Sequence, residues 1–197
     1  MDTFDAIVTR RSTRSYRPDP VEPEKLRKII EAGRHAPSGG NSQTSHFLVV
    51  QKPEALARLI DLAEKGLARM EVREDTYASL KRCILRARQG GYVFTYHAPV
   101  LVVMANKRGY GNAMADCVAA IENMMIEANE LDLGTCYINQ LNWLGDDPAL
   151  VEYLRSLGLA EDERVFASLA IGHADSESGL PSRTPLERRG NRVTWIG

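Results

Sequence analysis

The densest group of arginines lies near the start of the chain, in the eight residues from Arg10 to Arg17. It carries four arginines and three small hydroxyl side chains. A guanidinium is permanently charged and presents N–H donors in pairs that match two phosphate oxygens. Cations are also favoured at the end of a helix, and the spacing of Phe4, Ile7 and Val8 predicts a helix from Asp2 to Thr9. The stretch alone therefore fits either a phosphate site or a solvated helix end.

A second polar group fills the loop from Ala36 to Gln43, which follows the next predicted helix. Two adjacent glycines would let its backbone approach a flat ligand closely. The side chains that add hydrogen-bond donors and acceptors are Ser38, Asn41 and Gln43. The same composition is typical of an ordinary turn between a helix and a strand, so both interpretations stay open.

Composition excludes several classes of function. The 197 residues carry 25 basic and 26 acidic side chains, and a net charge of -1 offers no general surface for nucleic acid. The 44% hydrophobic content fits one globular domain. Three scattered cysteines without a CxxC pair predict a reducing compartment and neither a disulfide framework nor a metal site. No apolar run reaches the roughly 20 residues that span a bilayer, and no secretory signal is visible, so we expect a cytoplasmic protein without a membrane partner.

The remaining pattern places helices between short apolar strands. Strands are predicted at residues 46–51, 99–106, 135–138 and 164–172, and helices at 23–36, 54–65, 113–131 and 148–157. The helix at 113–131 is apolar nearly all round, which predicts a position in the core or across a dimer interface. Gly134 is expected to cap its C-terminus.

Two segments are less regular. Residues 66–96 predict one or two loosely packed helices, which could form a lid over a site or a plain surface. Residues 173–197 show no helical spacing and end in the apolar run Val193–Ile196. This tail predicts an extended arm that lies on another subunit.

Taken in order, these motifs resemble the FMN-dependent nitroreductase family over nearly the whole chain. The motifs that carry the resemblance are Arg10-Arg11-Ser12-x-Arg14-x-Tyr16, Ala36-Pro37-Ser38-x-x-Asn41-x-Gln43, Ala98-Pro99, Ala120–Met125, Leu133-Gly134-Thr135-Cys136, Ile171-Gly172 and Pro181-x-Arg183-x-Pro185-Leu186. The resemblance implies an α+β fold, a three-layer α-β-α sandwich with a mixed, mainly antiparallel central sheet. It also implies one FMN-binding domain over residues 1–197, with 66–96 as a lid or substrate-pocket segment and the arm 173–197 exchanged with the partner subunit.

The resemblance also implies where FMN would bind. Its phosphate would be held by Arg10, Ser12 and Arg183, with Arg11 in the same group. Arg14 would reach the pyrimidine edge, where a cation stabilises the anion of the reduced ring. The ring and ribityl chain would meet the partner's loop, namely Pro37, Ser38, Gly39 and Asn41, with Gln43 in the same loop. The N5 and O4 side would face Tyr137, Ile138 and Asn139. Asn139 and Gln140 stand where many relatives carry small residues.

The implied activity is that of an FMN-dependent oxidoreductase. NADH or NADPH would give hydride to flavin N5 and leave, and a nitro-aromatic or quinone-like small molecule would then be reduced, in a ping-pong sequence. The flavin carries the chemistry, so no side chain is assigned as catalytic beyond Arg14 as an electrostatic stabiliser, and no metal is expected. The resemblance further implies a homodimer with shared flavin sites. A specialised flavin enzyme of the same fold, of dehalogenase or dehydrogenase type, and a non-catalytic flavin-binding or storage protein remain as alternatives.

Overall fold

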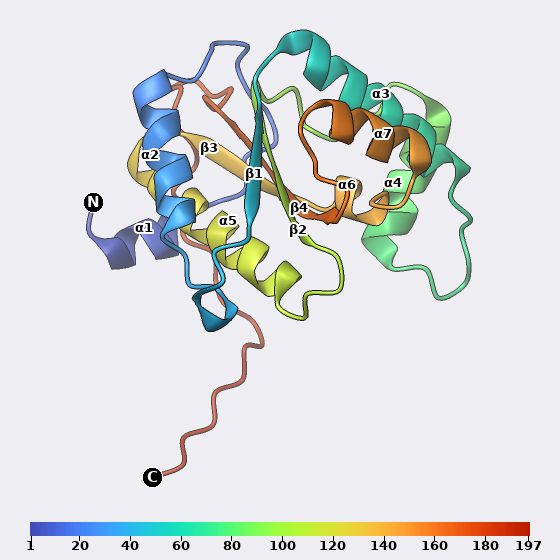
Figure 1. The fold of residues 1–197 in the computed structure, drawn as a ribbon. Helices are drawn as coiled ribbons and strands as arrows, with labels where there is room; N and C mark the ends of the chain where they lie inside the picture. The colour runs from blue at the N-terminus through green and yellow to red at the C-terminus, as the bar shows by residue number, and fades with distance from the viewer.

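A single antiparallel sheet of four strands forms the centre of the molecule. The computed structural model describes residues 1–197 and orders the strands β1-β2-β4-β3 (Figure 1). Their bounds are His46–Val50 for β1, Val100–Lys107 for β2, Gly134–Ile138 for β3 and Glu163–Gly172 for β4. The parallel contact in the structure is an isolated bridge between Ser12 and Thr135, outside the four strands.

The central strand β2 is buried on both faces. Leu101, Val103 and Ala105 belong to one hydrophobic cluster, while the alternate residues of the strand belong to another. Because successive side chains of a strand point to opposite faces, this continuous apolar run needs helices on both sides of the sheet.

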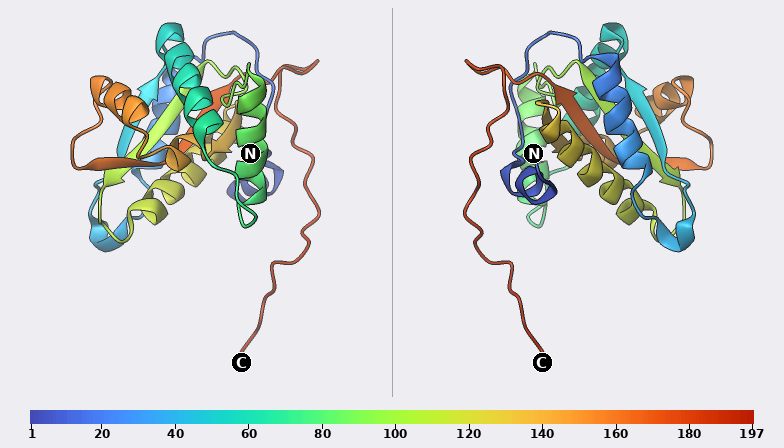
Figure 2. Two further views of the ribbon diagram at one scale, coloured as in Figure 1. Left: turned by 90° about the vertical axis from the view of Figure 1, so that its right-hand side faces the viewer. Right: turned by 90° about the vertical axis from the view of Figure 1, so that its left-hand side faces the viewer.

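Helices supply a layer on each face (Figure 2). One layer is formed by α2 (Pro23–Arg34) and α5 (Ala113–Glu130), with α1 (Thr3–Thr9) packed against α5. The other is formed by α3 (Pro53–Arg69), α4 (Ala78–Gln89), α6 (Gln140–Trp143) and α7 (Pro148–Ser156). The predicted three-layer α+β sandwich is thereby confirmed. None of these helices combines the length and the apolarity that a bilayer crossing requires.

The irregular segment at 66–96 is better anchored than its sequence predicts. Its first residues belong to α3, which continues to Arg69 because Leu67 is fully buried. A single helix, α4, follows, with Ile84 and Ala87 turned into the core, and Phe94 is also fully buried. The expectation of loose packing is wrong for these positions, while a lid function stays a prediction.

Gly134 has a different role from the one its sequence position predicts. The C-cap of α5 is Leu131, the left-handed residue beyond it is Asp132 at φ 63°, and Gly134 already begins β3. A Cβ atom on Gly134 would lie 2.6 Å from Oγ1 of Thr13. The prediction of a helix cap is therefore wrong, because glycine is needed here for the close approach of the N-terminal segment.

The C-terminal arm first follows the body of its own chain and then leaves it. The N–H of Asp175 donates to the carbonyl of Ser15 at 3.0 Å, but the end of the arm extends into solvent (Figure 1). Trp195 and Ile196 are 91% and 94% exposed. Large apolar side chains at this exposure agree with an arm that lies on another subunit, and that contact stays a prediction.

Candidate functional site

The basic stretch begins at the C-terminal end of α1 and continues along the edge of β3. The chain leaves the helix at Arg10, Ser12 pairs with Thr135, and the N–H of Thr13 donates to the carbonyl of Thr135 at 2.8 Å. Since side chains alternate in an extended segment, Arg10, Ser12 and Arg14 share one side of it. Arg10 is the C-cap of α1, and Ser12 and Arg14 are exposed, so the two interpretations of this stretch both remain open at this point.

The three side chains of this row meet around Cys136 of β3. Burial raises the pKa of the Cys136 thiol, and Arg14, Ser12 and Arg10 act against that rise. Arg10 forms an ion pair with Glu122, with Nε 3.4 Å from Oε1, yet its Nε is buried without a hydrogen-bond partner. An unsatisfied buried guanidinium donor beside a hydroxyl is the arrangement that an anionic group would complete.

The start of the arm lies next to this row. Nη1 of Arg11 donates to the carbonyl of Thr184 at 2.6 Å. Arg183 donates to the carbonyl of Asn129 and pairs with Asp132, whose Oδ1 lies 2.7 Å from Nη2. The side chain of Asn129 in turn donates to the carbonyl of Ala6 at 3.0 Å. The four residues predicted for phosphate binding therefore gather near the C-terminal ends of α1 and α5.

The second predicted motif is held at the opposite end of α5. The loop contains the short 3-10 turn η1 (Gly39–Asn41), and the N–H of Gly39 donates to Oδ1 of Asp116 at 3.1 Å. Tyr110 donates its hydroxyl to the carbonyl of Gly39 at 2.9 Å. A Cβ atom on Gly39 would collide with Asn112 and Tyr110, so the missing side chain serves contacts within the chain.

The polar side chains of this loop line a small hollow. A cavity of about 140 Å³ is bordered by Pro37, Ser38 and Gln43, together with Asp116. Within the loop, Gln43 donates from Nε2 to Oδ1 of Asn41 at 3.0 Å. Oδ2 of Asp116 is buried without a partner in the single chain.

One chain does not bring the two motifs together. An α-helix rises about 1.5 Å per residue, so Asp116 and Asn129 lie about 20 Å apart along α5. The loop is fixed at the first position and Arg183 at the second, while Arg10 pairs with Glu122 between them. This separation agrees with the prediction that the loop at each site comes from another copy of the chain, and that contact stays a prediction.

A larger cavity adjoins the basic row. It has a volume of about 360 Å³ and lies between the end of β3 and α4. Its lining combines the predicted residues Arg14, Tyr137, Ile138 and Asn139 with Cys136, Gln140, Trp143, Tyr77, Ser79, Arg82, Cys83, Arg86, Tyr92 and Tyr96. The sequence interpretation missed the residues of α4, although the spacing of Arg82, Cys83 and Arg86 already places them on one face of a helix.

The side chain of Gln140 forms a hydrogen bond within the wall of this cavity. Its Nε2 donates to the hydroxyl of Tyr92 at 2.6 Å, and that hydroxyl donates to Sγ of Cys83 at 3.2 Å. Burial raises the pKa of Tyr92, which therefore remains a neutral donor at ordinary pH. The amide of Gln140 thus joins α6 to the segment after α4, while Asn139 also lines the cavity.

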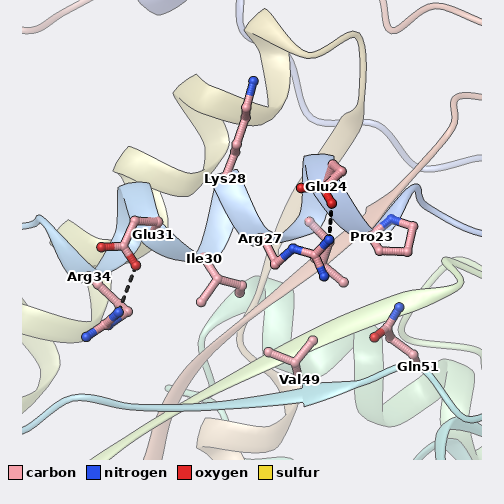
Figure 3. Close-up of a pocket in the computed structure, with 10 residues that line it drawn as sticks. Pro23, Glu24, Arg27, Lys28, Ile30, Glu31, Arg34, Val49 and Gln51 are labelled. Carbon is pink, nitrogen blue, oxygen red and sulfur yellow. Dashed lines mark hydrogen bonds and ion pairs between the residues drawn. The ribbon is translucent and has the colours of Figure 1, made fainter.

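A separate groove lies between α2 and the edge strand β1 (Figure 3). It encloses about 630 Å³, with Ile30 and Val49 among its apolar residues. Ion pairs along α2 border it, including that of Arg34 with Glu31, where Nη1 lies 2.8 Å from Oε2. It contains none of the residues predicted to bind flavin, so it is not the candidate site.

Comparison with known proteins gives consistent matches over the chain. A family model described as the Nitroreductase family matches residues 7–173. An NADH dehydrogenase of Thermus thermophilus is 32% identical over 95% of this chain and 94% of its own. A 4-nitrobenzoate reductase of Pseudomonas putida is 26% identical over 100% of this chain and 96% of its own. The crystal structure of a nitroreductase with bound FMN from Bacteroides fragilis is similar at a TM-score of 0.86, with 32% identity over 100% of both chains.

Proposed function

Because this chain belongs to the nitroreductase family, we propose that it is an FMN-dependent oxidoreductase. It takes electrons from NADH or NADPH and passes them to a nitro-aromatic or quinone-like acceptor. The observation that carries this proposal is the row of Arg10, Ser12 and Arg14 beside β3, in which the Nε of Arg10 is buried without a hydrogen-bond partner. FMN, when bound, supplies hydride acceptance and hydride donation at its N5 atom.

The residues of the chain then bind and orient. Arg10, Ser12 and Arg183 hold the phosphate through charge-assisted hydrogen bonds. Arg14 lines the cavity next to β3 and supplies a fixed positive charge at the pyrimidine edge, which favours an electron-rich ring. Binding of phosphate requires Arg183 to turn from Asp132, an exchange of one anionic partner for another.

We further propose that the working form is a homodimer with two shared sites. The outer face of α5 exposes Met114 and Val118, at 45% and 37%, in the N-terminal half of the helix. A two-fold dimer uses the same surface of both subunits, so in an antiparallel pair centred on the middle of α5 this half of one helix meets the C-terminal half of the other. If the two α5 helices pack antiparallel, the loop at the start of one helix reaches the basic row at the end of the other. The helix spacing in the single chain supports this arrangement.

The test follows the colour of the protein. The purified chain should bind FMN and be yellow, lose its colour with NADH or NADPH in the absence of air, and regain it with a nitro compound or a quinone. A yellow protein that neither nucleotide bleaches would be a flavin-binding or storage protein. A bleached protein that reduces neither acceptor would be a more specialised flavin enzyme. A protein that takes up no FMN would contradict the proposal.

A further inference from the structure

In the cavity of about 360 Å³ between β3 and α4, the helix α4 contributes two arginines that have no acidic partner. Arg82 and Arg86 lie one helical turn apart and both line the cavity. Arg82 donates from Nη2 to the hydroxyl of Ser79 at 3.0 Å, and the guanidinium of Arg86 lies 5.9 Å from the centre of the Tyr92 ring. Both contacts leave the positive charge uncompensated.

The neighbouring helix shows that such pairing is otherwise available in this layer. On α3, Arg58 pairs with Asp61 at 2.8 Å and Arg69 pairs with Asp147 at 2.6 Å. Arg82 and Arg86 are in no ion pair, and both project from the face of α4 that borders the cavity. Both side chains are exposed to solvent in the single chain, so their charges are free to contact a ligand in the cavity.

The charge balance of the cavity points the same way. Its lining contains the three guanidinium groups of Arg14, Arg82 and Arg86 and no aspartate or glutamate. Asp175 lines an adjoining hollow, where its carboxylate accepts from the hydroxyl of Ser15 at 3.1 Å. Like charges around a partly enclosed space repel one another and attract an anion into it.

The same lining suits a flat ring. Tyr77, Tyr92, Tyr96 and Trp143 surround the space between α4 and β3. A guanidinium matches both oxygens of a carboxylate with its parallel N–H donors. We therefore propose that the acceptor of this protein is an anionic aromatic compound whose carboxylate is bound by Arg82 and Arg86. This proposal rests on the proposed function, because it names the acceptor class of that site.

The kinetic test compares two acceptors that share one ring. Nitrobenzoate is anionic and nitrobenzamide is neutral, so the ratio of their kcat/KM values measures recognition of the charge. We expect the ratio to favour nitrobenzoate and to fall about fivefold in Arg82→Gln and in Arg86→Gln, the size expected for an ion pair near solvent. The kcat/KM for nitrobenzamide and the affinity for FMN should stay unchanged. Lys81→Gln is the matched control, since Lys81 is an exposed cation of α4 outside the cavity lining.

A binding test separates this inference from the activity itself. Calorimetry with the FMN-loaded protein should show benzoate binding more tightly than benzamide, and both arginine variants should lose that difference. An unchanged ratio and an unchanged benzoate affinity would overturn the proposal. The proposal would also be overturned if the arginine variants raised the KM for NADH and kept the preference for nitrobenzoate, because the arginines would then bind the nucleotide. Failure to reduce either nitro compound would count against the proposed function, while the benzoate measurement would still decide the inference.

Discussion

Ser12 pairs with Thr135 in a parallel bridge, and this contact fixes the basic N-terminal stretch against the edge of the central sheet. The neighbouring N–H of Thr13 reinforces it by donating to the carbonyl of Thr135 at 2.8 Å. The bridge therefore decides which side chains can act together, because Arg10 and Arg14 must flank Ser12 on the same side of an extended chain.

The first prediction concerns the phosphate contacts. Arg10→Ala and Arg183→Ala should each weaken FMN binding by about ten- to a hundredfold, since a hydrogen bond to a charged group contributes about 1.5–3 kcal/mol. Titration of the protein with FMN measures the affinity. Arg17→Ala is the control from the same stretch, because Arg17 pairs with Asp19 at 2.7 Å and lies half in solvent.

A purely structural role of Arg183 would give a different result. The contact of Arg183 with Asp132 ties the arm to the end of α5. If this is the only role of Arg183, its replacement lowers the stability of the protein and leaves FMN affinity unchanged. Thermal unfolding without FMN should therefore be measured beside the titration. Unchanged FMN affinity in both the Arg10 and Arg183 variants would refute the phosphate assignment.

The fold was predictable because its signals are local. The order of motifs and the continuous apolar run of β2 depend on neighbouring residues. The extended backbone that puts Arg10, Ser12 and Arg14 on one side was not predicted, because it depends on the bridge to Thr135. The role of Gly134 was not predictable from the sequence, because Thr13, which it approaches closely, is distant in sequence. Arg82 and Arg86 were missed for a similar reason. The spacing of Leu80, Cys83, Ile84 and Ala87 indicates the buried face of α4, but the position of that helix beside the end of β3 depends on residues distant in sequence.

The second prediction concerns the dimer. Met114→Lys and Val118→Lys should shift the protein toward monomer and lower FMN affinity at the same time, because both side chains are exposed in one chain and the loop of a partner is needed at each site. Sedimentation and FMN titration follow the two effects. Leu85→Lys is the control, since it adds the same charge at an exposed apolar position of α4. A monomer that retains full FMN affinity would contradict the shared site.

The third prediction concerns the arm. A chain that ends at Gly190 lacks Val193, Trp195 and Ile196, and its dimer should dissociate at least about tenfold more readily, because burying each such side chain contributes about 1.5–3 kcal/mol. Because β1 is an edge strand and its Val49 is 37% exposed beside the groove with α2, we expect these residues to lie there, and Val49→Lys should have the same effect. An intact dimer in both variants would show that the arm lies elsewhere.

The fourth prediction concerns alkaline pH. Burial raises the pKa of the Cys117 thiol to about 12. A thiol that ionises at lower pH in the unfolded chain favours unfolding as the pH rises, so its contribution is complete below about pH 8.5 and is lost between that value and about 12. The free energy of unfolding should fall by up to about 1.4 kcal/mol per pH unit from this group. Urea unfolding at several alkaline pH values measures the slope, and Cys117→Ala should show a shallower one. Equal slopes would contradict the assignment.

The last prediction concerns the close approach that places the basic row. Gly134→Ala should destabilise the protein by about 1–3 kcal/mol, as overpacking does, and should weaken FMN binding, because the added Cβ displaces Thr13 and with it Ser12. Thr13→Gly removes the atoms that the new methyl group meets, so the double variant should recover much of both losses. Urea unfolding and FMN titration of the two single variants and the double variant give the coupling between the sites. Additive losses would mean that Gly134 acts through the flexibility of β3, and the contact with Thr13 would then not be what positions the phosphate-binding residues.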